Sequence, residues 1–152
     1  MMVFLYKFAA MRYLAIVFLL LACSDEPDFI DGRVSQYVNQ FYSEASARGL
    51  NNLSKDVTVL VKPMDCGCDG VTYGTKIYIE QTFYDFNKSR AKANPQYDQY
   101  YNRVIESVVM HELGHAVLKK GHSSGLMAEK TPYHLYAWYD DKRKEFLDGL
   151  FE

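Results

Sequence analysis

The stretch VVMHELGHAVL at residues 108–118 decides the fold of this chain. Between positions 104 and 118 the sequence is apolar on nearly every side of a helix, which is typical of a helix buried at the centre of a domain. We expect this helix to run from about residue 95 to residue 119 or 120. It should end at Gly121, since a glycine commonly follows the last helical turn. The remaining elements must then pack around it.

His111, Glu112 and His115 place polar groups inside this apolar helix. The two histidines are four residues apart, so their rings lie one turn apart on the same face. Two imidazole nitrogens arranged in this way can bind one Zn²⁺ at about 2.0–2.1 Å each. Glu112 lies about 100° further round the helix, where it can reach the open side of the metal without binding it. The pattern predicts a zinc site with Glu112 as the catalytic base. The alternative is a chance motif on a solvated helix.

The longer stretch HELGHAVLKKGHSSGLM at residues 111–127 resembles the metzincins, a family of zinc peptidases. Their pattern is His-Glu-x-x-His-x-x-Gly-x-x-His, followed by a turn that carries a methionine beneath the metal. The resemblance implies that His122 is the third zinc ligand and that Met127 is the methionine of this Met-turn. The chain departs from the pattern because Leu118 stands at the glycine position and His122 follows one residue late. The helix must therefore end differently, which leaves the third ligand open.

Other residues are alternatives for roles in this site. His134 and Glu129 are the other candidates for third ligand, while His122 would then be an ordinary loop histidine. Tyr133 or Tyr136 could donate a hydrogen bond to a tetrahedral oxyanion. With 13 tyrosines in the chain, each of these two also has a plain structural interpretation.

A second resemblance covers residues 71–130. This region is similar to small exported metallopeptidase-like lipoproteins of Bacteroides-type bacteria, which share the longer histidine spacing and a lead-in like that at residues 76–79. The resemblance implies that the strand around residues 77–79 forms a sheet edge that pairs with an extended substrate.

The N-terminus has the pattern of an export signal. Residues 13–22 form an unbroken apolar run, which is too short to span a bilayer comfortably and suits the core of a signal peptide. The run leads into Cys23 in a segment that resembles a bacterial lipobox, implying cleavage after residues 1–22 and lipid attachment to Cys23. An uncleaved anchor helix is the alternative. The acidic stretch at residues 24–28 resembles a surface-export signal, and the segment 23–27 is equally well interpreted as a solvated acidic tether.

Cys66 and Cys68 stand in the segment DCGCDG. An oxidising compartment permits a disulfide between them, although a ring that joins residues two apart is tight. A Cys-x-Cys pair supplies half of a metal site at most, and the chain has no second pair. We expect a turn that contains either a local disulfide or two free thiols.

Composition and periodicity indicate a single domain over residues 28–152. The 152 residues are 24% charged and 15% aromatic, which argues against disorder, and a net charge of −2 without a basic stripe gives no indication of nucleic-acid binding. We expect an α+β fold, in which a small twisted mixed sheet is joined by an N-terminal helix and a central zincin active-site helix. The predicted elements are a helix at 28–48, strands at 57–61 and 71–79, a loop or short helix at 80–94, a loop at 122–138 and a short helix at 140–150.

Together these patterns predict a zinc-dependent endopeptidase. We expect a peptide or protein substrate, a monomer, and attachment by lipid to the bacterial outer membrane, with the cell surface left open as the final location. A lipid-anchored zincin-fold protein without catalytic activity is the main alternative. Two further alternatives are a protein that needs zinc only to fold and a zinc hydrolase that acts on bonds other than peptide bonds.

Overall fold

The computed structural model describes residues 29–129 and 133–152, with the side chains of residues 133–141 excepted. The predicted signal peptide, the predicted lipidation site Cys23 and the predicted acidic tether lie outside these residues. No helix within the described ranges has the length and apolar composition required to cross a membrane. Along the chain, the elements are α2 (Ser35–Ala47), β1 (Thr58–Lys62), β2 (Gly70–Tyr73), β3 (Lys76–Glu80), α3 (Gln81–Ala93), the 3₁₀ turn η1 (Pro95–Tyr97), α4 (Asp98–Ala116), the 3₁₀ turn η2 (Gly125–Met127) and α5 (Tyr133–Phe151).

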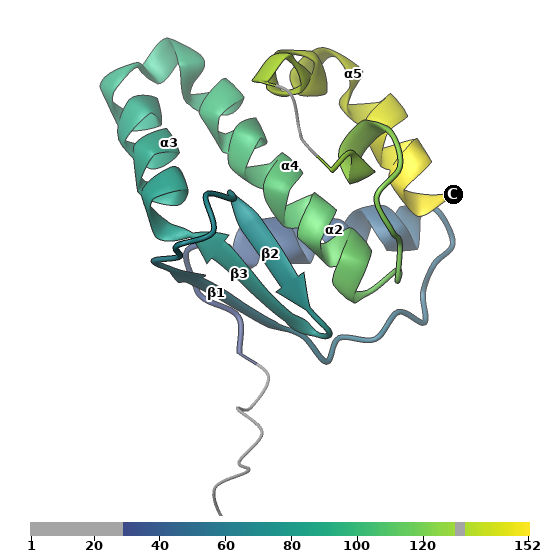
Figure 1. The fold of residues 1–152 in the computed structure, drawn as a ribbon. Coiled ribbons are helices and arrows are strands. Elements are labelled where there is room, and N and C mark those ends of the chain that lie inside the picture. Colours follow the sequence, from purple (N-terminus) through teal and green to yellow (C-terminus); the bar gives the residue numbers. More distant parts are fainter. Residues whose placement is uncertain (1–28, 130–132) are drawn as a thin grey trace, which may run out of the picture.

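The fold is α+β, as the sequence predicts. The strands form one mixed sheet in the order β1-β3-β2, in which β1 runs parallel to β3 and β2 runs antiparallel to it. Helix α4 packs against β2 and β3 and lies between α3 and α5 (Figure 1). The predicted N-terminal helix and the predicted central helix are both present.

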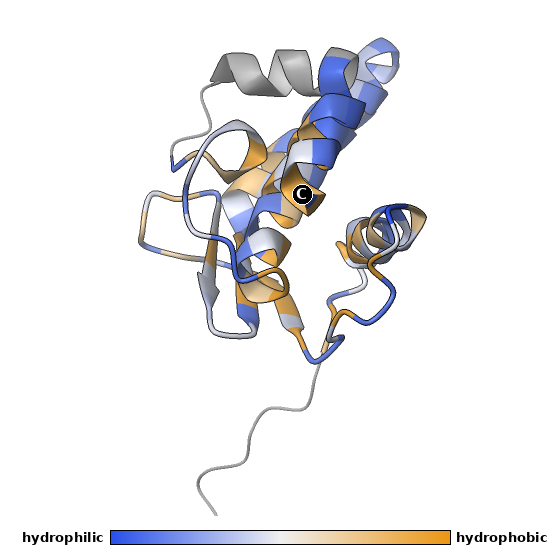
Figure 2. Cartoon of the chain, turned by 90° about the vertical axis from the view of Figure 1, so that its right-hand side faces the viewer, coloured by the Kyte–Doolittle hydropathy of each residue, from blue (hydrophilic) through white to orange (hydrophobic). Residues whose placement is uncertain are grey.

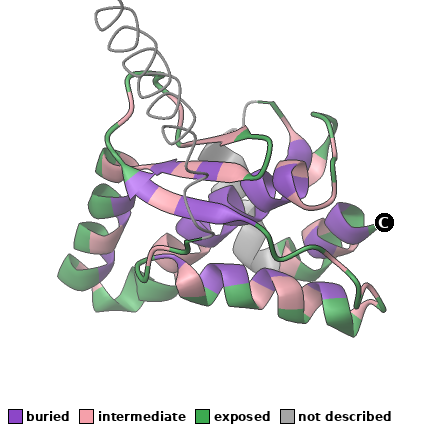
Figure 3. Cartoon of the chain, turned by 90° about the horizontal axis from the view of Figure 1, so that it is seen from below, coloured by how far each residue is buried: buried purple, intermediate pink, exposed green. Residues whose placement is uncertain are grey.

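The core lies between the sheet and the helices. Ile77 and Ile79 of β3 are fully buried, and so are Leu113 of α4 and Phe41 of α2. Figure 3 shows buried positions along the strands and exposed positions on the outer faces of the helices. Hydrophobic and hydrophilic positions alternate along the helices in Figure 2, as expected for elements with one buried face.

The predicted strand at residues 71–79 is a hairpin. Gly74 adopts a φ of 66° in the turn between β2 and β3, a left-handed conformation that glycine adopts without strain. As a result β3 lies in the middle of the sheet, paired with β1 and β2. The expectation that residues 77–79 form a substrate-pairing edge is therefore wrong, because β2 occupies that edge.

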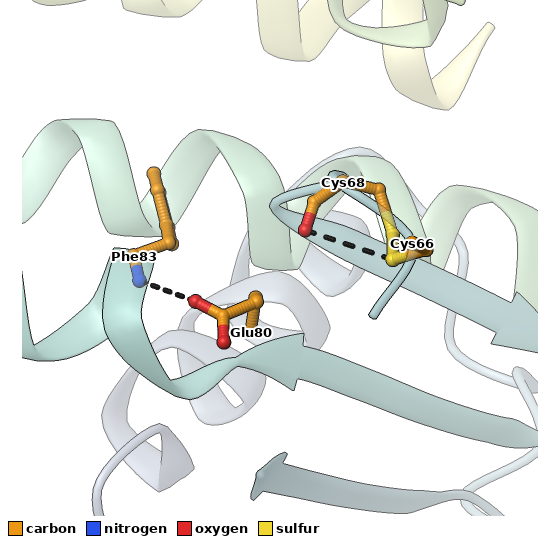
Figure 4. The surroundings of a disulfide bond; sticks show 4 residues. All are labelled: Cys66, Cys68, Glu80 and Phe83. Atoms are coloured by element: carbon orange, nitrogen blue, oxygen red, sulfur yellow. Dashed lines mark hydrogen bonds between the residues drawn. A yellow bond between two sulfur atoms is a disulfide. The ribbon is translucent and has the colours of Figure 1, made fainter. Parts of the chain in front are cut away.

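Helix α2, which precedes the three strands, and helix α3, which follows them, also differ from prediction. Helix α2 begins at Ser35, because the residues before it form first a parallel bridge, between Ile30 and Val59, and then a turn at 32–34. Residues 81–93 form a full helix, α3. Its first turn is capped by the carboxylate of Glu80, which accepts a hydrogen bond of 2.6 Å from the backbone N–H of Phe83 (Figure 4).

The central helix α4 ends at Ala116, earlier than predicted, and Gly121 does not terminate it. The chain reverses at Lys119, which has a φ of 57°. The backbone N–H of Lys120 then donates to the carbonyl oxygen of Gly114 at 3.1 Å. Helix α5 begins well before the predicted residue 140 and kinks at Lys142. The early end of α4 determines where the following loop lies.

A chain of ion pairs joins α2, α4 and α5. Glu106 of α4 is 1% exposed, and its carboxylate accepts hydrogen bonds from Arg103 and Arg143. Arg143 also binds Glu44 of α2 at 2.7 Å, and Glu44 in turn binds Arg48 at 2.6 Å. These pairs fix the register of three helices around the core.

Candidate metal centre

Three histidine rings converge at the C-terminal end of α4. The Nε2 atoms of His111 and His115 are 3.0 Å apart, and the Nε2 atom of His122 is 3.2 Å from that of His115. The candidate ligand atoms of all three residues lie within 4.8 Å of one another. His111 is mostly buried and His122 is exposed, so the cluster opens toward solvent on one side.

Backbone carbonyls determine which ring nitrogens carry protons. The Nδ1 atom of His111 lies 2.5 Å from the carbonyl oxygen of Leu126, and that of His115 lies 2.7 Å from the carbonyl oxygen of Lys120. A carbonyl oxygen only accepts, so each Nδ1 must donate, and in a neutral ring Nε2 then has a free lone pair. Burial lowers the pKa of His111, which favours its neutral form. Two lone pairs 3.0 Å apart repel unless a cation or proton lies between them, so this donor set fits a metal ion.

The loop that carries His122 is held against α4. The backbone N–H of Ser123 donates to the carbonyl oxygen of Met127 at 2.8 Å, which closes the segment into a compact turn. Met127 is 2% exposed and packs on α4 at Gly114, where a Cβ would lie 2.6 Å from its sulfur. Gly114, which precedes His115, thus allows the turn to approach the helix closely.

Glu112 lies beside the cluster on the side that faces the sheet. One of its carboxylate oxygens, Oε2, accepts a hydrogen bond of 2.7 Å from Thr72 Oγ1. Burial raises the pKa of Glu112, while the hydrogen bond from Thr72 and the charge of His115 oppose that shift. Gly70, two residues before Thr72, leaves the space in which the carboxylate sits.

The histidines and Glu112 line an open cleft of about 890 Å³. Strand β2 and the loop before it form one wall, and the loop after α4 forms the other. Glu129 also lines the cleft, but it is exposed and does not join the histidine cluster. The side chains of His134, Tyr133 and Tyr136 lie outside the described part of the structure.

Cys66 and Cys68 are joined by a disulfide (Figure 4), and Cys68 lines the cleft. This agrees with the first of the two states that the sequence predicts. Gly67 between them has a φ of 64°, which a glycine adopts without strain. Neither sulfur belongs to the histidine cluster.

Sequence reasoning did not single out Gly70 and Thr72, although both contact Glu112. A weak signal was available, since residues two apart in a strand point to the same face. That signal does not say which distant residue the face will meet. No protein-family model matches this chain, and neither a curated protein nor a solved structure was found to be similar to it.

Proposed function

We propose that this chain is a zinc-dependent endopeptidase. The observation that supports the proposal best is the convergence of His111, His115 and His122 next to a buried glutamate in an open cleft. The three Nε2 atoms would hold the ion. Three protein ligands leave one coordination position open, which is typical of catalytic zinc sites.

Zinc, when bound, supplies a Lewis acid that polarises the scissile carbonyl and lowers the pKa of water. Glu112 takes a proton from the attacking water and later passes it to the leaving amine. Its burial supports this role, because a raised pKa brings a carboxylate closer to the pH at which it must both accept and release a proton. The histidine rings are oriented by the carbonyls of Leu126 and Lys120, so little reorganisation is needed at the site.

Strand β2 supports a peptide as the substrate. Among the described residues it pairs with β3 alone, and its residues Gly70, Val71 and Thr72 line the cleft. An extended peptide can add to such an edge through main-chain hydrogen bonds and so bring its carbonyl close to Glu112. In this proposal β2 takes the role that the sequence suggested for residues 77–79.

The proposal includes export of the chain. The signal-like residues 1–22 and the lipobox-like segment ending in Cys23 would anchor the domain to the bacterial outer membrane, where it would act as a monomer on proteins or peptides. The Cys66–Cys68 disulfide supports an oxidising compartment, because such bonds persist outside the cytosol.

The decisive experiment compares the zinc-loaded wild type with Glu112→Gln. We expect the wild type to bind one zinc ion and to cleave peptides in a mixed-sequence library read by mass spectrometry. Glu112→Gln should retain zinc and lose cleavage at least about 1000-fold, since it removes the base and leaves the ligands. A fully active variant would contradict the mechanism, and zinc binding without any cleavage by the wild type would favour the non-catalytic alternative.

A further inference from the structure

We propose that Thr72 is a positioning residue that holds the Glu112 carboxylate in its working orientation, with Gly70 keeping the space for it. This inference rests on the proposed function, in which Glu112 is the base. Strand β2 would then position the catalytic base as well as bind the substrate.

The contact between Thr72 and Glu112 is specific to one oxygen. Thr72 Oγ1 lies 2.7 Å from Glu112 Oε2 and 3.1 Å from the backbone carbonyl oxygen of Glu112. A hydroxyl has a single proton, and the shorter contact assigns it to the carboxylate. Among the described residues no hydrogen bond reaches the other oxygen, Oε1. Since Glu112 lines the cleft, one oxygen is held by Thr72 while the other is left for proton transfer.

Gly70, in the same strand as Thr72, leaves the space that the Glu112 carboxylate occupies. The register pairs Gly70 with Ile79 and Thr72 with Ile77, so both residues face α4 together with those buried isoleucines. A Cβ at position 70 would lie 2.9 Å from both Cγ and Oε1 of Glu112. Any larger residue at this position would have to displace the carboxylate. Thr72 therefore attracts one oxygen, and the bare backbone at Gly70 makes room for the other.

If the role of Thr72 were only structural, its hydroxyl would do no more than donate a hydrogen bond to a buried carboxylate. A positioning role instead predicts that turnover depends on the hydroxyl while zinc binding and folding do not. The hydroxyl makes its hydrogen bonds to Glu112, and the main chain of β2 stays the same in a side-chain variant, so loss of the hydroxyl should affect kcat and leave KM nearly unchanged.

The test compares Thr72→Val, which keeps the shape, with Thr72→Ser, which keeps the hydroxyl. Kinetics use a quenched fluorescent peptide selected by the zinc-loaded wild type. We expect Thr72→Val to lower kcat roughly 10- to 100-fold, with KM within about twofold and unchanged zinc content. Thr72→Ser should retain most of the wild-type kcat. Thr58→Val is the matched control, because Thr58 is a buried threonine of β1 that does not line the cleft.

A second readout does not depend on activity. Crystal structures of zinc-free wild type and Thr72→Val should show Glu112 Oε2 on the hydroxyl in the first and a turned or spread carboxylate in the second. Thr72→Ala replaces the valine variant if the latter does not fold. The inference is overturned if the carboxylate keeps its orientation without the hydroxyl, or if kcat stays within twofold of the wild type. A wild type that cleaves nothing refutes the proposed function instead, and the crystallographic comparison then decides the positioning role alone.

Discussion

Each of the two helical histidines is oriented by one backbone carbonyl. The acceptors for His111 and His115 come from Leu126 and Lys120, which lie beyond the end of α4. The loop thus directs the rings even though it contributes only His122 to the cluster. Changes in this loop should therefore affect metal binding without removing a ligand.

The first prediction at this scale concerns the third ligand. Replacing His122 with Ala should weaken zinc binding by more than about 100-fold, because it removes a donor rather than an outer partner. Competition with a chromogenic chelator measures the apparent Kd. His134→Ala and Glu129→Gln are the comparison variants, since the sequence leaves both open as ligands. A larger loss in either of them than in His122→Ala would contradict the assignment.

The second prediction concerns the close approach at Gly114. A Cβ there would lie 2.6 Å from the sulfur of Met127 and 3.0 Å from Cδ1 of Leu150, so Gly114→Ala should destabilise the fold by about 1–3 kcal/mol through overpacking. Urea denaturation measures the change. Gly149→Ala is the matched control, because no atom lies within 4 Å of its Cβ position in α5 and alanine favours a helix. Equal effects of the two variants would argue against the close packing.

At the scale of elements, the ion pairs decide how the helices are held together. Glu106 is almost fully buried, whereas its partners Arg103 and Arg143 are partly exposed. A buried carboxylate without partners is costly, and Arg103 comes from α4 itself, so the position of α5 across α4 depends on Arg143 reaching inward.

The third prediction follows from that burial. Glu106→Gln should cost about 3 kcal/mol of unfolding free energy, since it removes the buried charge that Arg103 and Arg143 both bind. Thermal and urea unfolding both report the change. Glu145→Gln is the control, because Glu145 forms an exposed pair with Lys142 that contributes little. A Glu106 variant as stable as this control would show that the pairs do not hold the helices.

The fourth prediction is a pH dependence of stability. Burial alone would raise the pKa of Glu44, but hydrogen bonds from Arg48 and Arg143 outweigh it and lower the pKa below its usual value. A lowered pKa in the folded state means that the stabilisation is complete above the unfolded-state pKa and is lost as the pH falls through the folded-state value. Urea midpoints measured between neutral and acidic pH should therefore fall less steeply in Glu44→Gln than in the wild type. Parallel curves would contradict the prediction.

At the scale of the whole molecule, the core and the histidine cluster adjoin each other along α4 but consist of different residues. The core residues fill the space between the sheet and the helices, while the cluster lies at the cleft at the end of α4. A fold built in this way does not need the metal to bury its apolar surface. It is the arrangement expected when a metal serves chemistry rather than folding.

The fifth prediction is that removal of zinc abolishes cleavage and leaves the fold intact. After treatment with a chelator the far-ultraviolet circular dichroism should persist, and the melting temperature should fall because the ion binds only the native state. Added zinc should restore both activity and melting temperature. Unfolding on chelation would instead favour the alternative in which zinc is needed only for folding.

The hairpin shows why the sheet was only partly predictable. The alternation in residues 71–79 correctly indicates β structure, but it predicts a single strand where the chain reverses at Gly74 and forms two. Whether a glycine bends a strand or reverses it depends on what the next residues pair with. Here Lys76–Glu80 also pairs with β1, so the reversal decides which strand borders the cleft.

The sequence alone determined the features that depend on neighbours within one or two turns. Helical hydrogen bonds span four residues, so the spacing of His111, Glu112 and His115 implies their relative directions before any tertiary contact forms. Only the tertiary structure decided that His122 meets the pair and that Thr72 and Gly70 meet Glu112. The contact of His122 depends on the turn at Lys119, and the contacts of Thr72 and Gly70 depend on how the hairpin packs against α4. Such contacts depend on how whole elements pack, which no local pattern encodes.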